Sequence, residues 1–465
     1  TDRTRLVVGC EDEIIESLRW LKIEWQEGFG VGGPHEPYRQ SERKEAGIYA
    51  ELVNQLLEAG HAYLAFDTPE ELTEMREFQQ INKQPIGYFG GMWRDASPEK
   101  VETAKAEGKP FVIRQRIPRG TTIVIEDAIR GRIEWDSDTV DDPVLIKADG
   151  MPTYHFAAMV DDHLMEISHI MRGEEWIASA PKHAVLFDQF GWERPIFVHC
   201  PVIKGKDGSK LSKRHGDTRV LDFRSAGFLP EAVVNFVSLI GWAPGGDREL
   251  MTMAELIDVF DLDGLQPSPG VFDMDKLRWM NGHFMRQKSV DELMTEISAY
   301  VHHPETQEYW QRPAHAEEGV WPRLEKLRNA LDRDPDYVRA VLPLEQERVI
   351  TLADFGEACE FFLVDEVEFT DNGRDKWFGE AHVPALLAAL ADFAEGKNAL
   401  SVEECEAWVK GYGQSQGFEK LGPVVHPIRV ALTGKTKGPG LYELMSVLGP
   451  KRIQDRVRRA QTMLG

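Results

Sequence analysis

The sequence predicts an α/β protein with a Rossmann-like core, a mixed α/β insertion and an all-α half that follows them. Residues 111–148 contain four short strand-like runs, separated by turn residues rich in glycine and proline. Residues 151–203 combine strand-like runs with one helix, and beyond about residue 220 the patterns are mainly helical. With 465 residues the chain is long enough for several domains.

The N-terminal elements are predicted as helices. Residues 11–22 and 42–59 both carry apolar residues at helical spacing, so each is expected to form an amphipathic helix. The phrase Thr68-Pro69-Glu70-Glu71 combines an N-cap, a proline at the first helical position and a capping-box glutamate. Ser97-Pro98 predicts the start of another helix, which Gly108 ends.

The next elements favour a parallel sheet. Residues 151–172 contain two strand-like runs, a helix is expected from Glu174-Glu175 to about residue 191, and residues 196–203 form another apolar strand. A strand, a helix and a second apolar strand are typical of a parallel sheet covered by helices. Ligands bind such sheets at the carboxyl ends of the strands.

Composition limits the classes of function. Basic residues number 54 and acidic residues 78, so the net charge of −24 argues against nonspecific coating of nucleic acid. No apolar run approaches the roughly 20 residues of a membrane-spanning helix. The four cysteines are far apart and lack zinc spacing, so we expect a reducing, cytoplasmic environment and no structural zinc.

A basic loop is the strongest local signal. Residues 203–219 carry six basic and two acidic side chains, a net charge of +4 in an acidic protein. Its glycines predict mobility, and its lysines and serines offer charge and donors to phosphate oxygens, so the loop could close over ATP. An exposed, solvated lysine loop is the alternative, but the position after an apolar strand favours ligand binding.

Several phrases together give the chain a family resemblance. Lys210-Leu211-Ser212-Lys213-Arg214 resembles the second signature of class I aminoacyl-tRNA synthetases, in the form typical of glutamyl-tRNA synthetases. Further similar phrases occur in the family's order, and these are PYRQSER at 37–43, PTYHFAAMVDDHLMEISHIMRGEEW at 152–176, GFLPEAVVNF at 227–236 and KLRWMNG at 276–282. The resemblance covers nearly the whole chain.

The resemblance implies a domain plan. Residues 1–51 and 153–220 would form the Rossmann-like catalytic domain, and residues 52–152 the insertion that binds the acceptor stem. Residues 221–320 would form a stem-contact domain and residues 321–465 a helical anticodon-binding domain.

The resemblance also implies site residues. Lys210, Lys213 and Arg214 would be catalytic, with Lys213, Glu175 and Trp176 binding ATP and with Tyr154 and Arg172 binding glutamate. A guanidinium pairs bidentately with a carboxylate, which suits Arg172 to this role. The alternatives are a structural Arg172 paired with Glu174 or Asp161, and a Tyr154 that belongs to the core. His155, His163 and His169 are expected to pack or hydrogen-bond rather than to bind metal.

The family's first signature is missing from the printed sequence. Relatives have a Pro-Ser-Pro-Thr-Gly loop and a His-x-Gly-His-like motif, whereas Thr1-Asp2-Arg3 resembles the end of a later family phrase. From the sequence we therefore expect a truncated polypeptide that is impaired in amino-acid activation, because these motifs meet the phosphates of ATP.

The C-terminal segment is expected to contact RNA. Residues 420–465 carry nine basic side chains against Glu443 and Asp455, a net charge of +7. By resemblance, Arg429, Pro439 and Leu441 would lie at the tRNA anticodon. A solvated helix whose cations favour the negative end of the helix dipole is the alternative.

The expected function is that of a monomeric glutamate–tRNA ligase, with tRNA(Glu), glutamate and ATP as partners and with Mg²⁺ accompanying ATP. A non-discriminating enzyme that also charges tRNA(Gln) and a tRNA-binding protein without catalytic activity are the alternatives. An enzyme that glutamylates a modified tRNA base fits less well, because such relatives lack the helical half.

Overall fold

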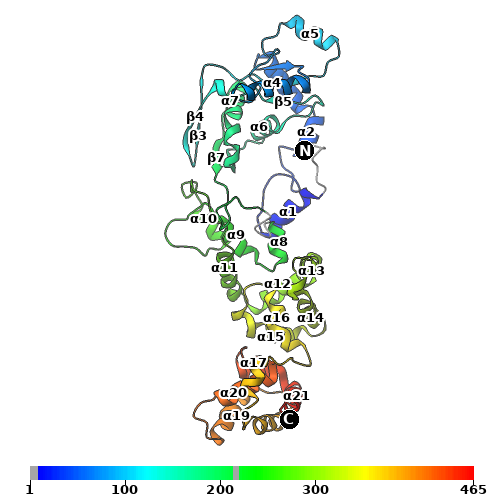
Figure 1. The fold of residues 1–465 in the computed structure, drawn as a ribbon, viewed down its shortest axis with the longest axis vertical. Coiled ribbons are helices and arrows are strands. Elements are labelled where there is room, and N and C mark those ends of the chain that lie inside the picture. The colour runs from blue at the N-terminus through cyan, green and yellow to red at the C-terminus, as the bar shows by residue number, and fades with distance from the viewer. Residues whose placement is uncertain (1–8, 213–218, 465) are drawn as a thin grey trace. The chain divides into compact units, whose positions relative to one another are not determined.

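The computed structural model describes residues 9–212 and 219–464, except for the side chain of Asn372. The chain forms two units (Figure 1). Residues 1–214 and 237–272 belong to the first unit, and residues 215–236 and 273–465 belong to the second.

The first unit mixes helices and strands. Its elements are α1 (Cys10–Trp20), α2 (Gln40–Glu45), α3 (Ile48–Glu58), β1 (Ala62–Ala65), α4 (Pro69–Ile81), α5 (Pro98–Ala106), β2 (Val112–Gln115), β3 (Thr122–Asp127), β4 (Gly131–Asp136), β5 (Val144–Ile146), α6 (Tyr154–Leu164), β6 (His169–Gly173), α7 (Ala180–Phe190), β7 (Ile196–Cys200) and α10 (Met253–Val259). The predicted capping box is present at α4, where Thr68 accepts from the Glu71 backbone and Glu71 reciprocates.

Two sheets organise this unit. β1, β2 and β5 form an antiparallel sheet, and the second sheet has the strand order β4-β3-β7-β6. In the second sheet β6 and β7 are parallel, with Arg172 opposite His199, and β3 joins β7 in parallel through Asp127 and Phe197. The strand, helix and strand predicted for a parallel sheet are therefore confirmed, and the carboxyl ends of β3, β6 and β7 lie at one edge.

A shared core fixes that edge. Phe156 and Val160 on α6 are fully buried, and they belong to the same apolar cluster as Phe187 on α7 and Phe197 on β7. Burial of side chains of this size stabilises a fold by roughly 2 kcal/mol each. Both helices are consequently held against the sheet that carries Arg172.

Two local predictions were wrong. The first strand-like run of residues 151–172 is the helix α6, because a short apolar run does not by itself distinguish a strand from a buried helix. The single helix predicted over residues 42–59 is divided into α2 and α3. Gly47 between them has a φ of 82°, a left-handed conformation that interrupts the helix.

The second unit is helical, as predicted. After α8 (Val220–Ser225) and α9 (Pro230–Ser238) its elements are α11 (Met274–Gln287), α12 (Val290–His302), α13 (Pro304–Gln311), α14 (Val320–Arg333), α15 (Pro335–Glu345), α16 (Asp354–Leu363), α17 (Asp371–Trp377), α18 (Val383–Ala394), α19 (Val402–Ser415), α20 (Gly422–Thr433) and α21 (Leu441–Thr462). The α/β core, insertion and all-α half of the prediction are thus confirmed.

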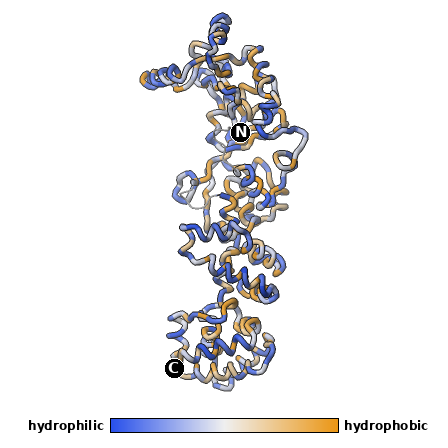
Figure 2. Tube along the Cα trace, turned by 90° about the vertical axis from the view of Figure 1, so that its right-hand side faces the viewer, coloured by the Kyte–Doolittle hydropathy of each residue, from blue (hydrophilic) through white to orange (hydrophobic). Residues whose placement is uncertain are grey.

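Hydrophobic residues are distributed along the chain rather than gathered in one segment. Figure 2 shows hydrophobic and hydrophilic residues alternating along the trace. Among the described residues, no helix combines the length and apolar character required to cross a membrane.

Candidate functional site

Arg172 forms the centre of a polar group at the carboxyl end of the sheet. It lies near the end of β6, where its Nε donates to Nε2 of His199 on β7 over 3.1 Å. Its Nη1 lies 3.1 Å from Nδ1 of His183 on α7. The guanidinium is thereby held between a strand and a helix of the same unit.

The alternative ion pairs considered for Arg172 are not formed. Glu174 pairs with Arg130 instead. Asp161 pairs with Arg43 over 3.0 Å and accepts a hydrogen bond from the Tyr49 hydroxyl. In the part of the chain that the structure describes, no carboxylate contacts Arg172 directly.

One nitrogen of Arg172 is left open. Among the described residues, Nη2 of Arg172 is buried and makes no hydrogen bond of good geometry, while the Tyr154 hydroxyl lies close enough to the guanidinium to act as an acceptor. Burial lowers the pKa of the Arg172 guanidinium, while the neighbouring Tyr154 hydroxyl and the carboxylates of Asp162 and Asp127 act in the opposite direction. A buried donor without a partner is costly, and an acceptor from a ligand would satisfy it.

Tyr154 and Trp176 form an aromatic pair beside this group. Tyr154 starts α6, and Trp176 lies in the 3-10 helix Glu174–Ser179 that follows β6. Their ring centroids are 4.6 Å apart, and Tyr154 remains 46% exposed. Such exposure does not suit a core tyrosine, whereas an open aromatic face can pack against a ligand.

Lys210 and Glu175, two of the predicted site residues, lie together. Lys210 Nζ is 3.2 Å from Glu175 Oε1. Residues 203–211 form a turn closed by hydrogen bonds, since Gly205 N donates to Ser209 O and Leu211 N donates to Ile203 O. Lys213 and Arg214 lie outside the described residues.

The residues predicted for the anticodon also come together, in the second unit. Arg429 on α20 donates from NH1 to the carbonyl of Pro439 over 2.5 Å, and Leu441 begins α21 directly after this turn. Arg348 donates to the carbonyl of the adjacent Gly438. Pro439 and Leu441 are buried. Two arginines thus fix the position of this turn.

The basic C-terminal segment is not one exposed patch. Arg456 is 1% exposed, and its terminal nitrogens donate to three backbone carbonyls. Arg459 pairs with Glu366, and Arg452 lies over the Tyr337 ring at 4.5 Å. The predicted charge of +7 therefore overstates what this surface offers to phosphates, because a charge count does not distinguish buried cations.

The three histidines singled out in the sequence pack or hydrogen-bond, as predicted. His163 stacks on Trp192 with a centroid distance of 3.8 Å, and His169 Nδ1 lies 3.0 Å from the Ser168 hydroxyl. His155 Nδ1 lies 2.9 Å from His183 Nε2. The described part of the chain contains no group of three histidine, cysteine or carboxylate side chains arranged to hold a metal ion.

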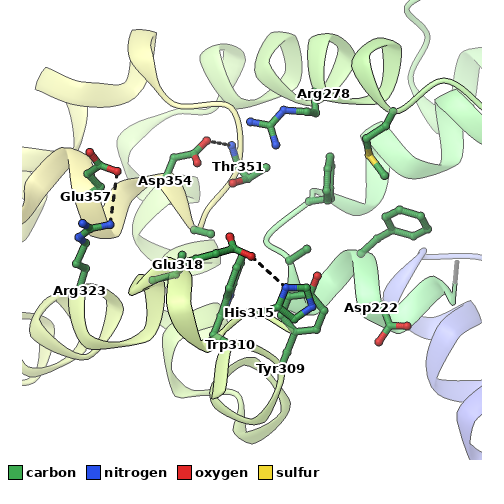
Figure 3. A pocket seen from close by; sticks show the side chains of 16 residues that line it. Asp222, Arg278, Tyr309, Trp310, His315, Glu318, Arg323, Thr351, Asp354 and Glu357 are labelled. Carbon is green, nitrogen blue, oxygen red and sulfur yellow. Dashed lines mark hydrogen bonds and ion pairs between the residues drawn. The ribbon is translucent and has the colours of Figure 1, made fainter. Parts of the chain in front are cut away.

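A separate cavity of about 510 Å³ lies within the helical unit (Figure 3). Its charged lining comprises the carboxylates Asp222, Glu318, Asp354 and Glu357 and the guanidinium groups Arg278 and Arg323. Several of these charged side chains already form ion pairs within the unit, including Glu318 with His315 over 3.2 Å and Arg323 with Glu357 over 3.6 Å. The excess of carboxylates disfavours an anionic ligand, so we assign no catalytic role to this cavity.

Sequence reasoning missed several polar residues around both groups. Asp127, His183 and His199 are close to Arg172 only through the fold, although the expected parallel pairing of two strands could have indicated His199. In the helical unit, Glu345 is 3% exposed and lies 3.9 Å from Arg348. Neither Glu345 nor Arg348 belongs to a local motif that would have identified it.

Comparison with known families agrees with this geometry. Residues 1–279 match the family described as tRNA synthetases class I (E and Q), catalytic domain, and residues 304–461 match an anticodon binding domain. The fold and the site thus define a class I aminoacyl-tRNA synthetase.

Individual relatives narrow the assignment. The chain is 36% identical over 460 residues to a glutamate–tRNA ligase of Desulforamulus reducens, covering 99% of this chain and 91% of the relative. It is 39% identical over 469 residues to one of Acidothermus cellulolyticus, covering 99% and 87%. The chain belongs to the glutamate–tRNA ligase family.

Solved structures resemble this fold as well. A glutamate–tRNA ligase of Elizabethkingia meningosepticum, in complex with its amino acid, superposes with a TM-score of 0.85 at 30% identity and covers 100% of this chain and 91% of that one. A glutamate–tRNA synthetase of Elizabethkingia anophelis gives a TM-score of 0.82 at 30% identity, with 99% and 91% covered.

Proposed function

We propose that this protein attaches glutamate to tRNA and that Arg172 recognises the side-chain carboxylate of glutamate. The open Nη2 group of Arg172 is the observation that carries the assignment. A carboxylate oxygen placed there would accept a charge-assisted hydrogen bond, and a second oxygen could be met by the Tyr154 hydroxyl, which lies beside the guanidinium.

The reaction has two steps. A carboxylate oxygen of the glutamate α-carboxyl group attacks the α-phosphorus of ATP, and pyrophosphate leaves to give glutamyl-adenylate. The ribose hydroxyl at the end of the tRNA then attacks the activated carbonyl carbon, and AMP leaves. No side-chain nucleophile is required, so the protein contributes by positioning the reactants and by stabilising developing charge.

We assign the ATP side of the site to the residues near Lys210. Its ammonium group is exposed and pairs only loosely with Glu175, at 3.2 Å, so a phosphate could take over this contact. Trp176, Lys213 and Arg214 would complete the nucleotide contacts. Magnesium would accompany ATP and neutralise phosphate charge, with most of its ligands from ATP and water.

The tRNA contacts follow the domain plan. We propose that the insertion of residues 52–152 binds the acceptor stem, that residues 221–320 contact the stem, and that residues 321–465 read the anticodon. Arg429 is the proposed reading residue, and the buried Pro439 and Leu441 form the turn that lies beside it. We further propose a monomeric enzyme of the cytoplasm.

The test is attachment of labelled glutamate to tRNA by the full-length protein. Charging of tRNA(Glu) is expected, and parallel reactions with tRNA(Gln) show whether the enzyme is non-discriminating. Filter binding of the same tRNAs separates binding from chemistry. Tight tRNA binding without charging would instead support a tRNA-binding protein that lacks catalytic activity.

A further inference from the structure

The hydrogen bonds of Arg172 continue beyond its two imidazole partners. On one side, His199 Nδ1 lies 2.6 Å from Asp127 Oδ2, and both side chains are fully buried. On the other side, His183 Nε2 lies 2.9 Å from His155 Nδ1. The result is an uninterrupted chain from Asp127 through His199, Arg172 and His183 to His155.

The direction of each hydrogen bond follows from arginine, which can only donate. The nitrogens that face Arg172, Nε2 of His199 and Nδ1 of His183, must therefore be unprotonated acceptors. The proton of His199 is then on Nδ1 and is donated to Asp127, and the proton of His183 is on Nε2 and is donated to His155. The network assigns one neutral tautomer to each ring.

Electrostatics favours the same neutral forms. Burial lowers the pKa of His183 to about 2, and the positive charge of Arg172 acts in the same direction. Burial also lowers the pKa of His199, against the opposing effect of Asp127, and it lowers the pKa of His155. A protonated imidazole would turn an N–H toward the guanidinium and place two positive charges in contact.

Neutral acceptors have a consequence for selectivity. A carboxylate in direct contact with Arg172 would orient the guanidinium but would also neutralise its charge. Imidazole acceptors orient it and leave the charge available, while the carboxylate of Asp127 stays one ring away. An undiminished positive charge favours a carboxylate ligand over a neutral amide of the same shape.

We propose that His199 and His183 are positioning residues that hold the Arg172 guanidinium in one orientation for the side-chain carboxylate of glutamate, and that Asp127 and His155 fix the tautomers of these two rings. The proposal rests on the proposed function, because it takes Arg172 as the glutamate-binding group. Residues that act through Arg172 should affect the binding of glutamate and leave the binding of ATP unchanged.

Matched amide substitutions test this, since asparagine and glutamine each mimic one imidazole nitrogen. In His183→Asn and His199→Gln, the amide oxygen replaces the nitrogen that accepts from Arg172, and the outer contact is lost. In His183→Gln and His199→Asn, the outer contact is retained and the contact to Arg172 is lost. The members of each pair have similar size and polarity, so their folding is expected to suffer similarly.

The KM for glutamate and the KM for ATP are measured for all four variants of the full-length protein. His183→Asn and His199→Gln should stay within about threefold of wild type in the KM for glutamate, whereas the swapped variants should raise it about tenfold or more, with the KM for ATP unchanged. Equal effects within each pair, or a parallel rise in the KM for ATP, would overturn the proposal. If the wild type does not charge tRNA with glutamate, the proposed function itself fails.

A second experiment measures the histidine tautomers directly and does not depend on the activity of any variant. Histidine-selective ¹⁵N labelling of the wild-type protein should show His199 protonated at Nδ1 and His183 protonated at Nε2 at pH 7, with the amide variants serving to assign the signals. A doubly protonated ring at either position, or the opposite tautomer, contradicts the proposed network.

Discussion

Two arginines, the half-buried Arg172 in the α/β unit and the fully buried Arg456 in the helical unit, differ in how their donors are satisfied. Arg456 is 1% exposed, and both of its terminal nitrogens donate to backbone carbonyls of Leu432, Phe361 and Val364. Among the described residues, its unpaired donor is Nε, whereas the unpaired donor of Arg172 is the terminal Nη2.

The difference separates a structural arginine from a binding arginine. Three carbonyls from two segments hold Arg456, so its side chain joins α16 and α20 to α21, and burial lowers its pKa to about 10. Neutral imidazoles hold Arg172 and leave a terminal nitrogen for a ligand. Burial alone therefore does not indicate the role of an arginine, and the position of the open donor does.

The largest expected effect is the loss of glutamate use in Arg172→Met. Without the guanidinium, the side-chain carboxylate loses its charged partner, and kcat/KM for glutamate should fall by roughly 10³-fold or more in the aminoacylation assay. Because His199 and His183 also lose their donor, some loss of stability is expected, and the assay is run well below the unfolding transition. A drop of less than about tenfold would mean that another group recognises the carboxylate.

Arg456→Met should show the reverse pattern. Three buried carbonyls lose their donors, so the free energy of unfolding of the helical unit should fall by about 3 kcal/mol. The KM for glutamate should stay at the wild-type value when it is measured well below the unfolding transition. Urea unfolding followed by circular dichroism measures the change, and an unaltered midpoint would contradict the structural role of Arg456.

The buried carboxyl group of Glu345 extends the comparison. Its ion pair with Arg348 is long, at 3.9 Å, so the negative charge is only weakly compensated. Burial raises the pKa of Glu345 to about 7, against the lowering effects of Arg348, Lys435 and Arg429. The folded state then binds this proton more tightly than the unfolded state, so stability decreases as the pH rises from about 4.5 through about 7.

Glu345→Gln should accordingly stabilise the protein at pH 8, by at most about 3 kcal/mol, with a gain that shrinks toward pH 5. Thermal unfolding at both pH values measures it. Equal shifts at the two pH values would show that Glu345 is not titrating between them and that packing, not charge, causes the effect.

The smallest expected effect concerns Lys437, an exposed lysine of the basic C-terminal segment, residues 420–465. If it contacts an RNA phosphate, Lys437→Ala should weaken tRNA binding a few-fold and reduce the slope of log affinity against log salt by about one. The matched control is Lys410→Ala on α19, whose ammonium already pairs with Glu406 over 2.6 Å. Identical salt slopes for both variants would remove Lys437 from the proposed RNA surface.

Local patterns predicted much of the fold. The capping box at Thr68 and the helical periodicity beyond residue 220 depend on neighbouring residues, and the structure confirms the corresponding elements. The apolar run that became α6 was misread because its burial, which decides between a strand and a helix, comes from α7 and the sheet. Its sequence alone did not contain that information.

The site was predicted in part, for the same physical reason. Tyr154, Arg172, Glu175 and Trp176 all lie within one continuous stretch of the chain, residues 152–176, and this stretch resembles the family. Asp127 and His199 are 72 positions apart and meet through the pairing of β3, β7 and β6. Arg456 was counted among the surface cations because composition carries no information on burial. Contacts over long sequence separations were the part that the sequence could not provide.

The central claim is that the open guanidinium of Arg172 receives glutamate. It is tested most directly by isothermal titration of glutamate into the full-length protein and into the variants Arg172→Met and Arg456→Met, each held below its unfolding transition. We expect wild-type affinity for Arg456→Met and no measurable binding for Arg172→Met. Binding of glutamate by Arg172→Met within about threefold of wild type would contradict the claim.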